Sequence, residues 1–321
     1  MTTVVSPVVA HLGEDFLTQV YGRTYRHFPG EPAVDELHPG VGELAQQLER
    51  HLRTGIQVNA YASWTPEEGF GVHWDDHDVI ALQIGGAKRW RVYGPTRQAP
   101  LHRDTDLPEP PPDEPLVELV LNAGDMLYLP RGWWHAVAAS EGVHSLHLTC
   151  GMQTTTGVDL LRWISEDLRR EICVRSDLPR FGTEEEKAEF VRTLGDLLMK
   201  EFGDDGLLDR YLSVRDATER SRLAPSLPYV EGVPADPGLV VRLVTSRARL
   251  SRDAEGNAVL VAGGEEWTFA SGTEPLLSLL VGGGAYRLDV LARAAGIRVG
   301  QAALLVSQLI DGELAAVEKT S

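Results

Sequence analysis

Residues 71–76 read Gly-Val-His-Trp-Asp-Asp, and residues 124–135 read Gly-Asp-Met-Leu-Tyr-Leu-Pro-Arg-Gly-Trp-Trp-His. Side chains at positions i and i+2 of a β-strand point to the same face, so a strand here would project His73 and Asp75 together. The second stretch contains a turn, a short apolar strand and a Pro-Gly turn, and it brings His135 to the start of a further strand. The sequence therefore predicts that two imidazoles and one carboxylate meet inside a β-rich domain.

Two histidines and one carboxylate form the facial triad that holds Fe(II) in non-haem oxygenases, so His73, Asp75 and His135 are the predicted metal ligands. The His-x-Asp pair alone is weak, because the chain has 10 histidines and 47 acidic residues and such pairs arise by chance. Its combination with His135, about 60 residues further on, is far more specific. Three protein ligands leave positions of the metal open for a 2-oxo acid and O2.

Short segments with the composition of β-strands dominate the first half of the chain. They lie at residues 61–64, 79–84, 89–93, 117–120, 126–129 and 145–148. Turns are expected between them at Gly85-Gly86 and Gly94-Pro95, among other places. A proline-rich segment, residues 100–115, cannot join the interior of a sheet and is expected to form a loop. Closely spaced short strands favour a barrel or sandwich over a parallel sheet.

The remainder of the chain changes to a helical pattern, with apolar residues at helical spacing from Leu160 to Ile172 and capping-box patterns that begin at Thr156 and Thr183. Beyond a proline-containing linker, we expect strands and helices at residues 240–243, 259–261, 274–280, 288–295 and 301–309. This order resembles a winged-helix domain, although residues 300–312, the would-be recognition helix, contain no Lys or Arg. The predicted organisation is a catalytic β-domain, a helical region and a winged-helix-like domain, at residues 1–155, 156–222 and 223–321.

Lys88 is the predicted partner of the distal carboxylate of a 2-oxo acid. If it lies on a strand with Trp90, the face that the two residues share points inward, and an inward lysine requires an anion. A lysine whose ammonium group reaches solvent is the alternative. Asn59 and Tyr61 share one face of the preceding strand and can hydrogen-bond to the same carboxylate or to the substrate. For Tyr61, a buried tyrosine with a structural role is the alternative.

The composition of the 321 residues, 43% hydrophobic and 24% charged, is typical of a globular protein. No apolar run reaches the roughly 20 residues of a membrane helix, and the N-terminus has no secretory pattern, so neither membrane insertion nor secretion is expected. Cys150 and Cys173 form no Cys-x-x-Cys pair, and we expect a cytoplasmic protein with free thiols. A net charge of −17 disfavours nucleic acid and favours a basic protein or peptide as partner.

Three segments together carry a resemblance to a known family: NAYASWTPEEGFGVHWDDHDVIALQIGGAKRWRVYGP at 59–95, LNAGDMLYLPRGWWHAV at 121–137 and SLHLTCG at 145–151. They resemble JmjC proteins of the ribosomal oxygenase group, cupin-type 2-oxoglutarate oxygenases that hydroxylate Arg or His side chains in ribosomal proteins. The resemblance covers residues 13–155 and extends further only in the order of the parts. It implies a double-stranded β-helix (a cupin/JmjC jelly roll), Fe(II), 2-oxoglutarate and O2 as cofactor and co-substrates, and a homodimer formed by the helical region.

The resemblance also implies residue roles. His73, Asp75 and His135 match the iron ligands, and Lys88 matches the residue that pairs with the C5 carboxylate of 2-oxoglutarate. Asn59, Tyr61 and His147 match positions near the co-substrate, although a buried histidine with a structural role is equally consistent with His147. His77 and His144 are expected to be structural or exposed. The Gly86-Ala87 pair departs from the acidic-glycine step usual in the family and leaves substrate choice open.

The function that the resemblance implies is hydroxylation of a peptide or protein side chain, an Arg or His, as in ribosomal proteins. A tailoring hydroxylase that acts on a biosynthetic peptide or a free amino acid is the alternative within the same chemistry. A non-catalytic JmjC-like binding module is the alternative from a different class. The predicted triad together with Lys88 argues against the binding module, because binding alone needs no iron.

Overall fold

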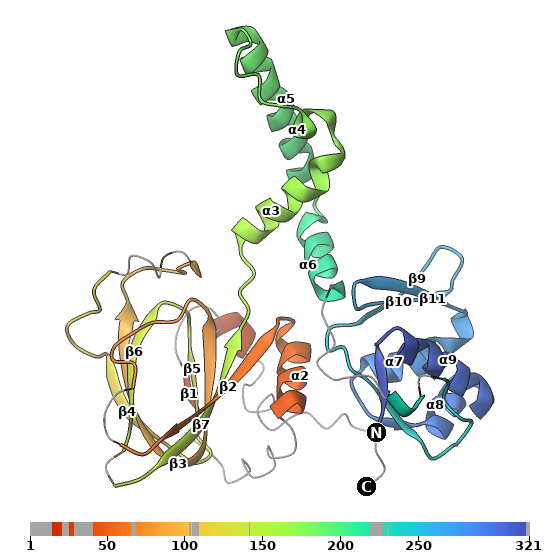
Figure 1. Ribbon diagram of the computed structural model, residues 1–321, viewed down its shortest axis with the longest axis horizontal. Helices are drawn as coiled ribbons and strands as arrows, with labels where there is room; N and C mark the ends of the chain where they lie inside the picture. Colours follow the sequence, from red (N-terminus) through yellow and green to blue (C-terminus); the bar gives the residue numbers. More distant parts are fainter. Residues whose placement is uncertain are drawn as a thin grey trace. The chain divides into compact units, whose positions relative to one another are not determined.

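The computed structural model describes residues 15–20, 26–28, 41–65, 69–102, 104, 109–140, 142–218, 227–229 and 231–318. The chain divides into two compact units, residues 1–154 with 219–321 and residues 155–218. The first unit holds a β-rich core and a smaller C-terminal part, and the second unit is helical (Figure 1). The predicted order of a β-core, helices and a small mixed part is confirmed, whereas the boundary at residue 223 stays a prediction.

The β-rich core is an antiparallel sheet whose order is β1-β5-β3-β7-β2, with β4 and β6 also paired to β3. Its described strands are β1 (Arg26–Phe28), β2 (Ile56–Ser63), β3 (Asp78–Pro95), β4 (Val117–Asn122), β5 (Met126–Leu129), β6 (Trp133–Ala139) and β7 (Ser145–Met152). They include all of the predicted strand segments except Trp64, which follows the end of β2. A short π-helix, η1 (Phe16–Val20), and the helix α2 (Val41–Leu52) accompany them.

β3 runs unbroken through both of the turns predicted at Gly85-Gly86 and Gly94-Pro95, so those two turn predictions are wrong. A β-bulge takes the place of the first turn: Gln83 pairs with His147 and Gly85 with Leu146, which leaves Ile84 as an extra residue. The bulge bends β3 without ending it, so that its first half pairs with β5 and β7 and its second half with β4 and β6.

The bulge also exchanges the two faces of β3, because one extra residue shifts the alternation of side chains by one position. Val79 before the bulge and Lys88 after it line the same cavity, although one position is odd and the other even. On the opposite side of the sheet, Ile80 and Leu82 pack against α2 in a buried cluster with Leu48. The amphipathic α2 (Figure 1) therefore packs on the outer face of the sheet, and the inner face lines the cavity.

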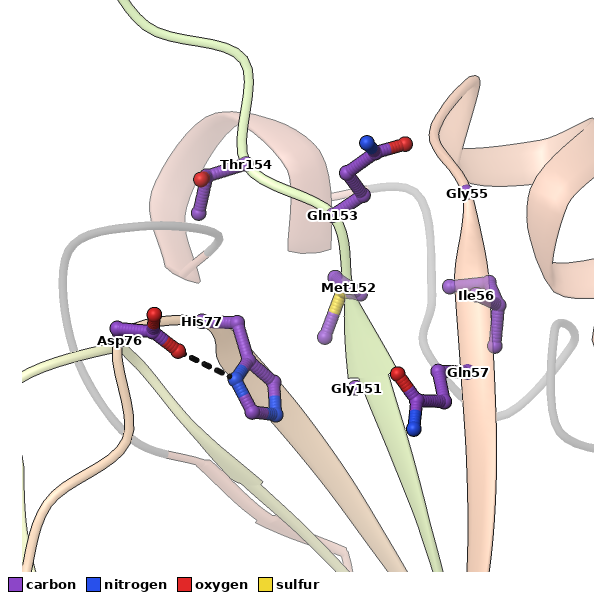
Figure 2. A pocket seen from close by; sticks show the side chains of 9 residues that line it. All are labelled: Gly55, Ile56, Gln57, Asp76, His77, Gly151, Met152, Gln153 and Thr154. Carbon is purple, nitrogen blue, oxygen red and sulfur yellow. Dashed lines mark hydrogen bonds and ion pairs between the residues drawn. The ribbon is translucent and has the colours of Figure 1, made fainter. Parts of the chain in front are cut away.

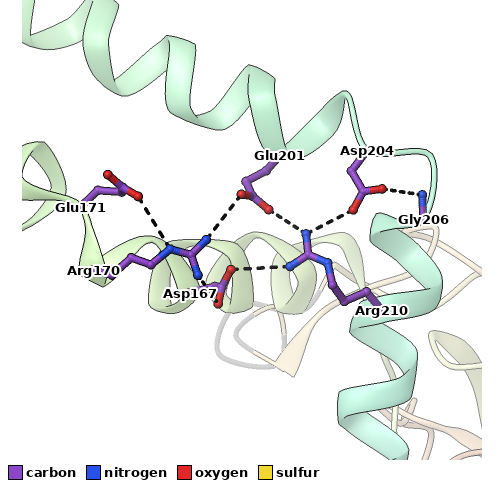
Figure 3. A network of polar contacts seen from close by, with 7 residues as sticks. All are labelled: Asp167, Arg170, Glu171, Glu201, Asp204, Gly206 and Arg210. Carbon is purple, nitrogen blue, oxygen red and sulfur yellow. Dashed lines mark hydrogen bonds and ion pairs between the residues drawn. The ribbon is translucent and has the colours of Figure 1, made fainter. Parts of the chain in front are cut away.

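The helical unit consists of α3 (Gly157–Asp167), η4 (Leu168–Arg170), α4 (Ile172–Arg175), α5 (Glu184–Phe202) and α6 (Leu207–Ala217). Both predicted capping boxes are confirmed: Thr156 and Thr183 each accept a hydrogen bond from the backbone three residues on. Arg210 joins the helices through Glu201 at 2.7 Å and Asp167 at 3.5 Å (Figure 3). Its guanidinium carbon also lies 5.0 Å from the Trp163 ring centroid.

The C-terminal part has two three-stranded antiparallel sheets, of order β11-β10-β9 and β12-β8-β13. Its elements are η5 (Leu227–Tyr229), β8 (Val240–Leu243), β9 (Arg249–Arg252), β10 (Ala258–Ala262), β11 (Glu265–Phe269), η6 (Ser271–Thr273), α7 (Glu274–Val281), β12 (Tyr286–Arg287), α8 (Leu288–Ala294), α9 (Val299–Asp311) and β13 (Ala315–Val317). The strands and helices predicted here from the sequence are confirmed. Within the described ranges no single helix is long and apolar enough to cross a membrane; α8 and α9 pass that test only as a pair bent by 105°.

Glu49 of α2 joins the β-core to the C-terminal part. Its buried carboxylate accepts hydrogen bonds from the Ile56 backbone N–H at 3.0 Å and from the Ser246 hydroxyl at 2.9 Å. Beside it, the Gln46 side chain donates to the Val244 carbonyl at 3.1 Å. Because Ile56 begins β2, these contacts fix the strand that carries Asn59 and Tyr61.

Candidate metal centre

The structure brings His73, Asp75 and His135 together. One potential ligand atom from each residue lies within 4.8 Å of the other two, and the His135 Nε2 atom is 3.7 Å from Asp75 Oδ2. His135 is the third residue of β6, as the prediction of a strand start requires. His73, however, lies outside the described strands and forms only an isolated antiparallel bridge to His135.

The expected strand around His73 and Asp75 is therefore wrong, although the convergence it predicted is present. Two backbone hydrogen bonds between His73 and His135, at 3.0 and 2.7 Å, bring the segment to β6. Gly71, with φ of +68°, turns the chain just before the bridge. The N–H of Gly132 donates to the Asp75 carbonyl at 2.9 Å and fixes the segment on the far side of the bridge.

Backbone carbonyls orient both imidazoles. The Nδ1 atom of His73 lies 3.0 Å from the Gly71 carbonyl oxygen, and that of His135 lies 3.0 Å from the Trp133 carbonyl oxygen. A carbonyl oxygen only accepts, so each Nδ1 carries the hydrogen and each Nε2 keeps its lone pair. A backbone carbonyl on the second ring nitrogen is the usual support of a metal-binding histidine.

Burial favours the neutral, metal-binding form of His135. Its side chain is 8% exposed, and this desolvation lowers the pKa of the imidazole, with the Asp75 carboxylate opposing the shift. Two neutral imidazole nitrogens and one carboxylate oxygen match the donor set of the facial triad for Fe(II). The described residues thus fit a bound Fe(II).

Lys88 lies buried in the cavity that the triad borders, a space of about 640 Å³. Its ammonium donates to the Ser63 hydroxyl at 2.5 Å, and no carboxylate among the described residues pairs with it. Burial lowers the pKa of this amine. An ammonium enclosed without an anion is costly, and the distal carboxylate of 2-oxoglutarate is an anion of suitable size. The alternative in which the ammonium group reaches solvent does not agree with its 4% exposure.

Of the other predicted binding residues, two line this cavity and one does not. Tyr61 and His147 line it with their rings stacked, 5.1 Å apart at 18°. Asn59 is exposed and is not among the residues that line the cavity. The outer histidines agree with expectation, since His144 is exposed and His77 contacts Asp76 at 3.0 Å.

Two residues that line this cavity also carry unsatisfied polar atoms. The Nδ1 atom of His147 and the Nε1 atom of Trp90 are buried without a hydrogen-bond partner in the described part of the chain. Burial, and then the charge of Lys88, lower the pKa of His147 to about 4, so the ring is neutral.

Sequence reasoning missed Ser63 and Phe70. Ser63 is the only hydrogen-bond partner of Lys88 among the described residues, and its place two positions after Tyr61, on the same strand face, was the signal available. Phe70 lines the cavity and is 75% exposed. Its ring centroid lies 6.2 Å from that of Tyr61 and 5.8 Å from that of His73. Nothing in its sequence context indicates this position.

The part of the chain that carries this centre is similar in sequence to known proteins. Residues 38–160 match the family model described as the JmjC domain. Among its curated relatives, the NO66 bifunctional lysine-specific demethylase and histidyl-hydroxylase of Dictyostelium discoideum is 32% identical over 203 residues, which is 57% of this chain and 39% of that protein. Human ribosomal oxygenase 1 is 39% identical over 149 residues, 44% of this chain and 23% of that protein.

The fold is similar to that of a solved structure along nearly the whole chain. The ribosomal oxygenase YcfD from Escherichia coli, in complex with cobalt and 2-oxoglutarate, superposes with a TM-score of 0.59 at 17% identity, covering 95% of this chain and 98% of that one. The β-core, the helices and the small C-terminal sheets therefore share their arrangement in the chain with that protein. By contrast, the chain spans only 11 to 39% of the length of the curated relatives it matches.

Proposed function

We propose that this protein is an Fe(II)- and 2-oxoglutarate-dependent hydroxylase of a peptide or protein side chain. The observation that carries the proposal is one cavity with two complementary ends. The His73, Asp75 and His135 donor set borders it, and the ammonium of Lys88 is buried within it without a carboxylate partner. A 2-oxo dicarboxylate has a chelating end for a metal and an anionic end for a lysine, so it satisfies both.

His73, Asp75 and His135 would hold the iron through two Nε2 atoms and a carboxylate oxygen. Iron held there would allow O2 to act as the oxidant: one oxygen atom of O2 would enter a substrate C–H bond, and the other would enter the succinate that forms with CO2 from 2-oxoglutarate. The residues of the chain contribute orientation: the Gly71 and Trp133 carbonyls fix the two imidazoles, and the bridge between His73 and His135 fixes their separation.

Lys88 and Ser63 are the proposed site for the distal carboxylate of 2-oxoglutarate. The ammonium of Lys88 supplies a charge-assisted contact, and the Ser63 hydroxyl can donate to the same carboxylate while it accepts from Lys88. Tyr61 and His147, whose rings stack, form one wall of the proposed co-substrate site. Asn59, exposed on the same strand, is assigned to the substrate side of the site.

We infer the substrate class from chemistry and relatives together. The chain carries a net charge of −17, which attracts basic partners. Two of its relatives are named as a histidyl-hydroxylase and a ribosomal oxygenase. An Arg or His side chain, in a ribosomal protein in particular, is therefore the proposed target.

Three finer structural features belong to the same proposal. The β-core is a double-stranded β-helix, the part from residue 223 onward is winged-helix-like, and the helical unit forms a two-fold homodimer. The dimer is supported by large apolar side chains that the helical unit leaves exposed, among them Ile172, Phe181 and Val191. Burial of such a patch against a second copy is the usual solution for an oligomeric protein.

The test is mass spectrometry of basic ribosomal proteins and candidate peptides after incubation with the protein, Fe(II), 2-oxoglutarate and O2. The expected result is a gain of one oxygen atom on an Arg or His residue, dependent on 2-oxoglutarate. Stimulation of turnover only by a free amino acid or another small metabolite would overturn the protein-hydroxylase proposal while leaving the metal and co-substrate assignments intact.

A further inference from the structure

A second pocket lies on the same strands as the metal cavity. β2 and β7 pair in register, so that Ser63, Tyr61 and Gln57 of β2 face Ser145, His147 and Gly151 of β7. Ser63 and Tyr61 line the metal cavity, whereas Gln57 and Gly151 line the second pocket. Because Gln57, Tyr61 and Ser63 are separated by even numbers of residues, all three lie on one strand face. The metal cavity and the second pocket therefore lie one after the other along a single face of the sheet.

The second pocket has a volume of about 480 Å³ and is bordered by polar side chains (Figure 2). Those that matter for recognition are Gln57, Asp76, His77, Gln153 and Thr154. Every one of them can accept a hydrogen bond, and neither Lys nor Arg is among the described residues that line the pocket. The amide and hydroxyl groups can also donate, so the charge of Asp76 is the feature that favours a positively charged ligand.

His77 is held over this pocket by its neighbours. Its Nδ1 atom lies 3.0 Å from Asp76 Oδ1, and because a carboxylate accepts, Nδ1 donates and Nε2 stays on the side of Gly151 (Figure 2). Gly151 leaves the room that the ring needs, since a Cβ there would lie 2.6 Å from the His77 Cδ2 atom and 2.7 Å from Nε2. The Asp76 carboxylate is fixed in turn by His102, at 2.6 Å from Oδ2.

The position of the pocket indicates what it binds. Ser63 and Lys88 mark the end of the face assigned to the distal carboxylate of 2-oxoglutarate, so the substrate has to approach from the Gln57 end. Asp76 and His77 directly follow the metal ligand Asp75 in the sequence. Gln57 is four residues from Tyr61, roughly 13 Å along an extended strand, which is too far for the side chain being hydroxylated to fill both hollows.

We propose that the second pocket binds a guanidinium group, from an arginine of the peptide substrate that flanks the hydroxylated residue. This rests on the proposed function, because only a peptide places a second side chain at that distance. The planar, five-donor guanidinium matches a lining of two amide oxygens, an imidazole nitrogen, a hydroxyl and a carboxylate. Such a subsite selects substrates by a residue that does not react.

The test uses N-acetyl-arginine amide and its uncharged analogue N-acetyl-citrulline amide, titrated onto the full isotope-labelled chain and followed by NMR. The arginine compound is expected to shift the Gly151 backbone amide and the side-chain amides of Gln57 and Gln153. Citrulline amide, and the variant Gln57→Lys with arginine amide, should each weaken binding by about tenfold, the size of one lost charge-assisted hydrogen bond. Gln308→Lys, the same change on an exposed glutamine of α9, should bind as the wild type does.

Several results would overturn the proposal: no detectable binding, equal binding of the two compounds, shifts confined to the metal cavity, or unchanged affinity in Gln57→Lys. Thermal melting of Gln57→Lys verifies that the variant is folded, which is expected because Gln57 is exposed. The experiment needs neither iron nor 2-oxoglutarate. Failure of the proposed hydroxylation would therefore leave this binding result unaffected, and the reverse also holds.

Discussion

At the scale of single residues, Lys88 has a position that folding alone does not explain. The residue is 4% exposed, and its ammonium has one hydroxyl as its partner among the described residues. A buried charge without a counterion destabilises a protein, so the position favours ligand binding over stability. The same trade of stability for binding is common at functional sites.

Lys88→Met therefore has two opposite effects. It removes a charge-assisted contact worth about 1.5–3 kcal/mol, so the apparent affinity for 2-oxoglutarate should fall about ten- to a hundredfold while Fe(II) still binds. It also removes an uncompensated buried charge, so the melting temperature of the metal-free protein should rise. Lys200→Met, at an exposed lysine of α5, should change neither quantity. An unchanged dependence on 2-oxoglutarate would mean that another cation binds its distal carboxylate.

His147 predicts a pH dependence of stability. Its pKa in the folded protein is about 4, below the ordinary 6.5, so the unfolded chain binds more protons between these values. The contribution to stability is complete above about pH 6.5 and is lost as the pH falls toward 4, up to roughly 3 kcal/mol. His147→Gln should flatten the decline in unfolding free energy over this range, measured by urea titration without metal. Identical slopes in both proteins would contradict the assigned pKa.

The residues of the metal triad and Lys88 could be predicted because their chemical types are rare together and their spacing fits strands. Ser63 could have been predicted from strand alternation, since it shares a face with Tyr61. Phe70 and His77 could not, because their positions depend on turns at Gly71 and on the open space over Gly151. Strand periodicity carries no information about such irregular segments.

At the scale of elements, the bulge in β3 decides which residues reach the cavity. Gly86 makes the bulge possible, because it has φ of +67° and because a Cβ there would lie 1.6 Å from the His144 carbonyl oxygen. Without the extra residue Ile84, either Val79 or Lys88 would face away from the interior. The Gly85-Gly86 pair, which was predicted to form a turn, therefore allows the single strand β3 to belong to both halves of the core.

Gly86→Ala should destabilise the protein by more than about 3 kcal/mol, because the backbone of β7 or β3 has to shift. Gly256→Ala is the matched control: Gly256 also has positive φ, +86°, but nothing lies within 4 Å of its virtual Cβ. That control should lose only about 1 kcal/mol, the cost of the left-handed conformation itself. Chemical denaturation measures both, and similar losses in the two variants would show that crowding at Gly86 is unimportant.

Element positions were predictable where one periodicity extended over the whole element, as in α5, α7 and α9. The errors occurred at β3 and around His73, where tertiary pairing decides the outcome. A glycine pair is compatible with a turn or a bulge, and only the partners β5, β7, β4 and β6 select the bulge. The His73 segment pairs at a single bridge, too short for alternation to appear in the sequence.

At the scale of the whole molecule, the helical unit predicts the oligomeric state. Only part of its apolar stripe is buried in the core of the helical unit. Ile164 and Leu168 are buried, but Leu161 and Ile172 are 52% and 77% exposed. We expect light scattering to give twice the 35.2 kDa mass of one chain. The double variant Val191→Glu with Met199→Glu, at two exposed positions of α5, should be monomeric and equally stable. A wild-type monomer at all concentrations would contradict the proposed dimer.

The measurement that tests the central proposal most directly is release of labelled CO2 from 2-oxoglutarate by the whole chain loaded with Fe(II). The wild type should bind about one iron per chain and release CO2, since three protein ligands define one centre. His135→Ala should lose both properties, whereas His144→Ala, which changes an exposed histidine nearby, should keep both. Undiminished CO2 release by a folded His135→Ala protein would contradict the assignment of the triad and, with it, the proposed function.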